Sequence, residues 1–197
     1  MSILHRTTMN TRRFGYWAVA LALVNIYPLR VLLAEDDHTH AAGNAASAGA
    51  LVKVVRDSTA RFKDVSAAQA AGYALMFGCV SGDDFGAMGL HYVNATLLNS
   101  GVIDATQPQI VIYEPQPGGG LKLVGADYLV FADAWNQTHD SPPQLMGQLF
   151  HLFDAPNRFN LPAFYTLHVW AWKDNPNGAF VNWHPNVSCE SFAGQNQ

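Results

Sequence analysis

Residues 121–132 read LKLVGADYLVFA, a run of aliphatic, β-branched and aromatic residues interrupted by a single acid, Asp127. The turn-forming residues 117–120 (PGGG) precede this run, and the apolar segment 109–113 (QIVIY) lies just before the turn. Two such runs joined by a glycine-rich turn are typical of a β-hairpin. The stretch therefore predicts a long strand paired with the strand before it.

Further strands are predicted on both sides of this hairpin, at residues 89–93, 165–172 and 179–183, with residues 175–178 (NPNG) as the turn between the last two. Residues 51–77 carry apolar side chains at three- and four-residue steps, which predicts one or two helices. The expected fold class is α+β: an N-terminal helix or helices, then a curled antiparallel sheet, with a small barrel as its closed form. The connection at 154–162 is expected to fold over the sheet.

The first 34 residues differ in character from the rest of the chain. Residues 1–13 are basic without an acid, and residues 14–26 form an apolar segment too short to span a bilayer comfortably. This order is typical of a cleaved export signal, and Arg12-Arg13 resembles a twin-arginine signal, with general secretion and a retained anchor as the alternatives. We predict a signal peptide at 1–34, a flexible linker at 35–50 and a single α+β domain at 51–197, in a periplasmic or secreted protein with no membrane span after cleavage.

Composition narrows the function classes. Of the 197 residues 49% are hydrophobic and 13% charged, enough to build the core of one domain. Residues 35–197 carry seven basic side chains and all 15 acidic ones, and this acidic balance argues against a nucleic-acid partner. Cys79 and Cys189 belong to no CxxC pair; in an oxidising compartment they are expected to form a disulfide, with two free thiols as the alternative.

Three polar residues stand inside otherwise apolar predicted strands: His91, Asp127 and His168. Burial of a lone carboxylate destabilises the folded state by roughly several kcal/mol, unless the group is paired or bound to a metal. Two histidines and a carboxylate on neighbouring strands would form a mononuclear site for Fe, Cu, Zn or Mn. Glu114, Tyr92 and His184 are candidates for an outer shell around it. A structural interpretation also fits, in which His168 and Asp127 only bond each other in an aromatic core, as does metal-free acid–base chemistry.

A second functional interpretation rests on aromatic residues. Trp170 and Trp172 share a face of the predicted strand at 165–172 and could offer an aromatic surface to a small ligand or a polysaccharide. The leading hypothesis is an exported protein with a metal site, acting as a metal-dependent oxidoreductase or a metal-binding module. The alternative is a non-enzymatic envelope protein that binds its ligand through the two tryptophans.

The chain resembles a family of exported bacterial proteins for which no activity is established. The resemblance covers residues 62–189 and rests on five motifs: GAMGLHYVN (86–94), YEP (113–115), LVGADY (123–128), LHVWAW (167–172) and NPNGAF (175–180). The family pattern has glutamate at the position of Asp127 and asparagine at that of His184. It therefore implies that a carboxylate belongs at position 127 and that His184 is a weak ligand candidate.

Overall fold

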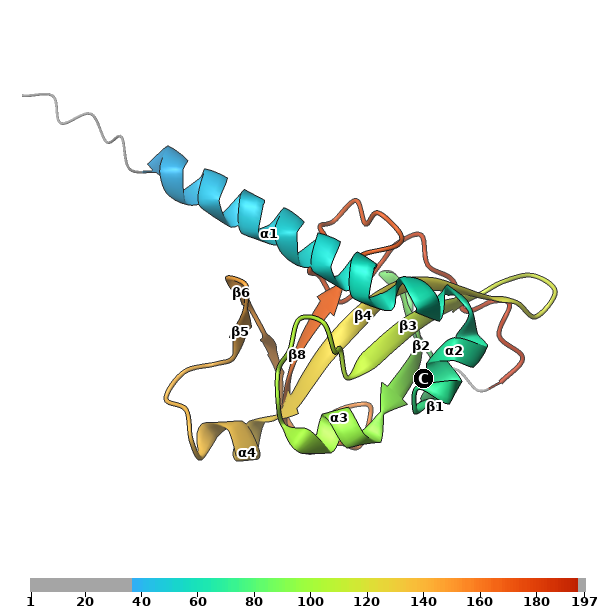
Figure 1. The fold of residues 1–197 in the computed structure, drawn as a ribbon. Helices are drawn as coiled ribbons and strands as arrows, with labels where there is room; N and C mark the ends of the chain where they lie inside the picture. The colour runs from blue at the N-terminus through green and yellow to red at the C-terminus, as the bar shows by residue number, and fades with distance from the viewer. Residues whose placement is uncertain (1–36, 195–197) are drawn as a thin grey trace, which may run out of the picture. The chain divides into compact units, whose positions relative to one another are not determined.

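The computed structural model describes residues 37–194, whose backbone is organised around one antiparallel sheet (Figure 1). Six strands follow in the order β1-β2-β3-β4-β8-β7, with bounds Tyr73–Gly82 (β1), Gly86–Asn94 (β2), Ile110–Pro115 (β3), Leu121–Phe131 (β4), Phe164–Val169 (β8) and His151–Phe153 (β7). A two-stranded ribbon, β5 (Gln144–Leu145) with β6 (Gln148–Leu149), precedes β7. The α+β class, the curled sheet and the hairpin of β3 with β4 are confirmed. The predicted signal peptide lies outside the described residues.

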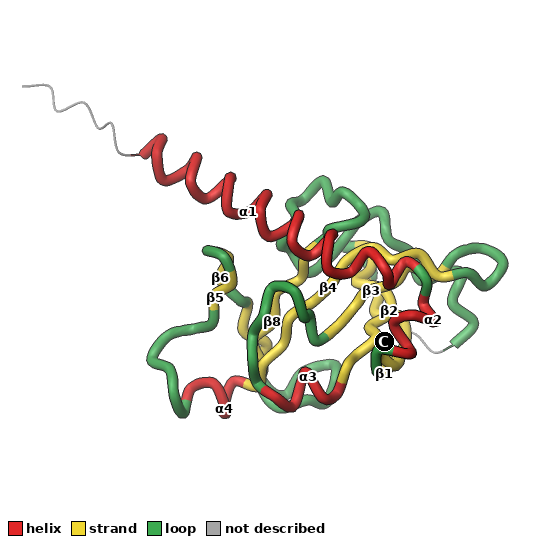
Figure 2. Tube along the Cα trace, in the orientation of Figure 1, coloured by secondary structure: helices red, strands yellow, loops and turns green. Residues whose placement is uncertain are grey.

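The longest helix precedes the sheet, and short helices follow strands β2 and β4 (Figure 2). Their bounds are Asp37–Thr59 (α1), Ala60–Lys63 (the 3₁₀ turn η1), Val65–Ala70 (α2), Ala95–Ser100 (α3) and Ala132–Asn136 (α4). Helix α1 begins within residues 35–50, which the sequence predicted as a linker; this segment is rich in alanine, the residue with the highest helix propensity. Among residues 37–194, none of the helices is long and apolar enough to cross a membrane.

Two sequence-based assignments were wrong. Residues 73–77, predicted as the end of a helix, begin β1, because Gly72 ends the preceding turn at a φ of 90° and pairing with β2 outweighs the local helix propensity. Residues 179–183, predicted as a strand, form a loop. That loop is held across the end of the sheet by Trp170, whose backbone N–H and indole N–H donate to the carbonyls of Ala179 and Val181.

Successive side chains of β4 and β8 point to opposite sides of the sheet. Leu51 and Val55 of α1 pack on one side, together with Ala126, Tyr128, Val130, Leu167 and Val169. The other side of the same strands carries Asp127, Leu129, Thr166 and His168, which line a small cavity. Helix α1 therefore covers the outer side, and the residues of the candidate site point to the inner side.

Glycines allow the sheet to curl. A Cβ at Gly125 of β4 would lie 2.6 Å from the carbonyl oxygen of Val169, and a Cβ at Gly89 of β2 would lie 2.7 Å from that of Tyr113. Gly89 also has a φ of 91°, which L-residues rarely adopt. The register between β3 and β4 shifts once, between Ile112 and Tyr113. Bulges and glycines at such positions are the usual means of bending a sheet.

Substitution of Gly125 by alanine is expected to lower the free energy of unfolding by about 1–3 kcal/mol, because the new methyl group must push β8 away from β4. Urea unfolding followed by circular dichroism would measure the change. Gly120→Ala is the matched control, since a Cβ there would meet only the side chain of Gln116 at 3.8 Å. Equal stability of the two variants would contradict this account of the curl.

A disulfide links β1 to the C-terminal segment. Cys79 and Cys189 are joined across 110 residues of sequence, so the predicted bridge is confirmed and both cysteines are accounted for. Cys79 is fully buried and Cys189 nearly so, and both belong to the core cluster that includes Tyr113 and Trp170. The bridge fixes the C-terminal loop against the strand at the edge of the sheet.

Reduction of this disulfide is expected to lower the free energy of unfolding by about 4–5 kcal/mol, the chain-entropy value for a loop of this length. Urea unfolding with and without reductant would measure the loss. A Cys79→Ala/Cys189→Ala double variant should be destabilised to a similar degree and should not respond to reductant. A stability unchanged by reduction would show that the bridge adds nothing to the fold.

Candidate metal centre

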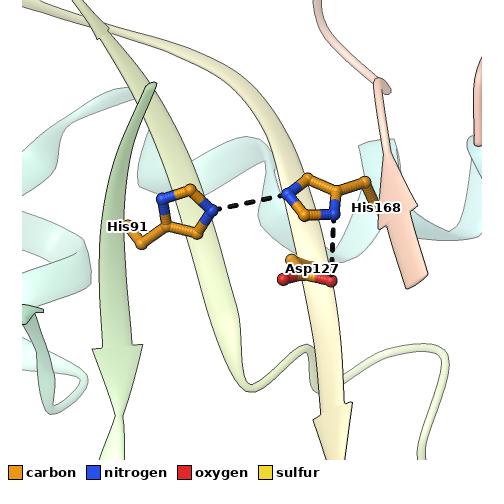
Figure 3. A group of neighbouring side chains, drawn as sticks. All are labelled: His91, Asp127 and His168. Carbon is orange, nitrogen blue, oxygen red and sulfur yellow. Dashed lines mark hydrogen bonds and ion pairs between the residues drawn. The ribbon is translucent and has the colours of Figure 1, made fainter. Parts of the chain in front are cut away.

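Three buried polar side chains from three strands meet on the inner side of the sheet (Figure 3). His91 comes from β2, Asp127 from β4 and His168 from β8; their exposed fractions are 5%, 2% and 3%. Strands β2 and β8 are separated by β3 and β4, a distance of about 14 Å in a flat sheet. The two histidine rings nevertheless lie only 5.6 Å apart between centroids, so it is the curl of the sheet that brings them together.

The facing nitrogens of the two histidines lie at the spacing of metal ligands. One donor atom from each residue can be chosen so that all lie within 4.8 Å of one another. Nε2 of His91 is 3.4 Å from Nε2 of His168, and Nδ1 of His168 is 3.6 Å from Oδ1 of Asp127. Two ligands bound at 2.0–2.1 Å to a tetrahedral ion stand about 3.3–3.4 Å apart. His168 can bind a given ion through only one of its ring nitrogens, so the 3.4 Å and 3.6 Å contacts cannot both be ligand spacings. The three residues predicted from the sequence are nevertheless brought together, and with one donor atom each within 4.8 Å of the others they could hold one ion.

Neighbouring backbone atoms orient the His91 ring. Its Nδ1 lies 3.2 Å from the carbonyl oxygen of Gly89, which can only accept, so Nδ1 carries the proton and Nε2 keeps a free lone pair. That lone pair faces His168. A backbone carbonyl on the far nitrogen is the usual way in which a metal-binding histidine is held in the correct tautomer.

The Asp127 carboxylate is held by its own set of donors. The hydroxyl of Thr166 donates to Oδ1 at 2.5 Å, and the backbone N–H groups of Tyr128 and Leu167 donate as well. These bonds fix the carboxylate next to His168 and leave lone pairs free, since a carboxylate can accept about four bonds. Nδ1 of His168 is buried and has no hydrogen-bond partner among the described residues.

Burial sets the charge of the cluster. It lowers the pKa of His91 to about 4 and that of His168 to about 3, because an imidazolium ion is poorly solvated there. Burial also raises the pKa of Asp127 to about 6, an effect that His91 and the hydrogen bond from Thr166 oppose. Near pH 7 the site therefore offers two neutral imidazoles and one carboxylate, the protonation states in which these groups bind a metal.

A cavity of about 20 Å³ adjoins the three residues, and its remaining walls are apolar apart from Thr166. Met88, Ile110, Leu129 and Phe164 form the buried walls, while Phe77, Phe153, Phe159 and Leu161 are half-buried on the outward side. Phe159 and Leu161 belong to the connection 154–162, which therefore does fold over the sheet as expected. A space of this size holds about one water-sized molecule.

Glu114 and Tyr92, which were expected in an outer shell around the site, make their contacts elsewhere in the fold. Both carboxylate oxygens of Glu114 accept from Lys173, at 2.7 and 2.8 Å, and Oε1 also accepts from the backbone of Ser188. Tyr92 lies on the face opposite His91 and packs against Tyr113, with ring centroids 5.0 Å apart. Glu114 therefore fastens the C-terminal segment to β3 and has no contact with the three polar residues.

His184 packs on Trp170 beside the site, whereas Trp172 packs against Thr59 and Lys63. The rings of His184 and Trp170 are in edge contact at 4.9 Å, and Trp170 lies between His184 and His168. Trp170 is only 2% exposed. Trp172 is half-buried, its indole N–H donates to Thr59, and Lys63 covers its ring at 4.0 Å. The two indoles therefore share no open surface on which a sugar could stack.

Sequence reasoning missed several residues of the site. Thr166 could have been found, because it stands two residues before His168 on the same face of one strand. The carbonyl of Gly89 and the rings of Phe77 and Phe159 carry no such signal, since chain folding alone brings them to the cavity.

Comparison with protein-family models, with characterised proteins and with solved structures finds no match. The resemblance to a family of exported proteins stays a prediction.

Stability of the metal-free protein is expected to fall as the pH drops from about 6.5 to 4. Over this range the histidines become protonated in the unfolded chain, whereas His91 and His168 stay neutral in the folded protein because their pKa values are lower there. Acidification therefore favours unfolding. Asp127 acts in the opposite sense between about 6 and 3.8, because it keeps its proton when folded. Two histidines outweigh one carboxylate, so the net loss should be roughly 1–3 kcal/mol.

Urea unfolding in the presence of a chelator, at several pH values, would measure this dependence. Asp127→Asn removes the opposing group while keeping an acceptor for Thr166, so its stability should fall more steeply with acidification than that of the native protein. A shallower slope in this variant would show that the assigned charges are wrong.

Proposed function

We propose that this protein binds one divalent metal ion through His91, Asp127 and His168, and that it works outside the cytoplasm as a metal-binding protein with a reactive ion. The observation that carries the proposal is the 3.4 Å separation of the two Nε2 atoms beside a buried carboxylate. A ligand set of two histidines and one carboxylate leaves at least one position of the ion open, as in catalytic metal sites.

The alternative, a purely structural cluster, leaves polar atoms unsatisfied. His91 presents a lone pair at Nε2, because its proton is on Nδ1. If His168 donates Nε2–H to that lone pair, its own Nδ1 lone pair faces the Asp127 carboxylate at 3.6 Å. If His168 carries its proton on Nδ1, two lone pairs face each other at 3.4 Å. Either neutral tautomer is unfavourable in an apolar core. An imidazolium at His168 would satisfy both contacts, but burial lowers the pKa of His168 to about 3 and so disfavours that form near pH 7. A cation among the three groups removes the conflict.

The donor set suits zinc, iron, copper or manganese. With iron, copper or manganese the open position supports an oxidoreductase; with zinc it supports a module that holds the ion or activates water. The spacing of the two nitrogens is that of a tetrahedral site. Burial of the site among aromatic side chains would limit solvent access and so shift the redox potential of the ion and the pKa of a water bound to it.

Export is supported by the disulfide and by the basic, then apolar, composition of residues 1–26. A disulfide in the core persists where thiols are not kept reduced, as in the periplasm or outside the cell. The N-terminal segment as a cleaved signal, and the Arg12-Arg13 pair as a twin-arginine signal, belong to the same proposal.

Protein purified without a histidine tag and stripped with a chelator is expected to bind one Co²⁺ or Zn²⁺ per chain. Isothermal titration would measure the affinity for Zn²⁺, and the visible spectrum of the Co²⁺ form would report the geometry of the site. His91→Gln and His168→Gln should each weaken binding by more than the roughly 10–100-fold that loss of an outer-shell partner costs.

His139→Gln is the matched control, because His139 is exposed and stacks on Trp135 away from the cluster. This variant should keep the native affinity and stoichiometry. Absence of a stoichiometric ion in the native protein, or an equal loss of metal affinity in His139→Gln, would contradict the proposal.

A further inference from the structure

We infer that the open position of the bound ion takes a small uncharged molecule of the dioxygen or nitric oxide kind, and that organic substrates do not reach it. This inference rests on the proposed metal site and adds its substrate class. It is carried by the cavity beside His91, Asp127 and His168, by the chemistry of its walls and by the residues that separate it from solvent.

The size of the cavity limits what can approach the ion. Its volume is about 20 Å³, room for one molecule of about the size of water. Pockets that hold organic ligands are of the order of 300–1,000 Å³. A sugar, an amino acid or an aromatic ring therefore cannot lie beside the metal unless the surrounding core is displaced.

The walls select against hydrated ions. Apart from the three cluster residues and Thr166, the cavity is bounded by four phenylalanines, two leucines, one isoleucine and one methionine. The hydroxyl of Thr166 is already committed to Asp127. An incoming anion would lose its water and gain no hydrogen-bond donor from these walls, which is costly. A weakly hydrated diatomic molecule meets no such barrier.

The entrance lies on the outward side of the cavity. The cluster residues are nearly inaccessible, whereas Phe77 of β1 and Phe159 of the connecting loop are half-buried, with ring centroids 5.4 Å apart. The loop is fastened next to them, because Arg158 donates to the carbonyl of Ser81 at 2.9 Å and lies over the ring of Trp183. Phe159 is thus the side chain whose removal would widen the entrance most directly.

The test uses the protein loaded with Fe²⁺ under anaerobic conditions and then exposed to nitric oxide. A stoichiometric ferrous–nitrosyl adduct, seen by its half-integer-spin EPR signal, is expected. Azide, a small anion, and imidazole, a neutral ligand too large for the cavity, should leave the optical spectrum of the Co²⁺ form unchanged. Phe159→Ala should strengthen imidazole binding by roughly tenfold or more, since it relieves the overlap.

Phe85→Ala is the matched control, because Phe85 is 62% exposed and is not among the residues that line the cavity. Leu161→Ala opens the same wall and serves as a second variant if Phe159→Ala does not fold. A native protein that binds its ion but forms no nitrosyl adduct, or that binds azide or imidazole as readily as Phe159→Ala does, overturns the inference and leaves the metal site standing. Failure to bind any ion overturns both.

Discussion

The contact between His91 and His168 depends on the curl of the sheet, because the two residues belong to strands that are separated by two others. The curl in turn depends on close backbone approaches that only glycine allows, at Gly125 against Val169 and at Gly89 against Tyr113. The same Gly89 supplies the carbonyl that orients the His91 ring. One local feature of β2 therefore bends the sheet and also sets the tautomer of a side chain two residues away.

Burial of Asp127 imposes a second constraint. A carboxylate that is 2% exposed needs compensation, and the chain provides the hydroxyl of Thr166, two backbone N–H groups and the nearby imidazoles. Both histidines are held neutral, so the cluster has no positive charge of its own to balance the carboxylate near neutral pH. A divalent cation bound among the three residues would supply that charge, so electrostatics as well as distances would favour its binding.

The central part of this arrangement could be predicted from the sequence, because polar residues inside apolar strands stand out from a period-two pattern. His91, Asp127 and His168 were identified in that way, and the hairpin of β3 with β4 followed from the turn at 117–120. Strand β1 was missed because its Tyr-Ala-Leu-Met segment also suits a helix, and only pairing with β2 decides between them. Glu114 was expected near the site, but its partner Lys173 lies 59 residues further along the chain, a pairing that no local pattern reveals.

The apolar wall of the cavity would also govern the rates at which an ion binds and dissociates. The donor atoms lie behind Phe77 and Phe159, and the loop that carries Phe159 is tied to β1 by Arg158. Exchange of a bound ion would then require local opening of that loop, so its rate would depend on the opening equilibrium of the loop as well as on the strength of the metal–ligand bonds. An ion bound at such a centre would be retained kinetically, and the metal found there would depend on which one was present when the loop closed.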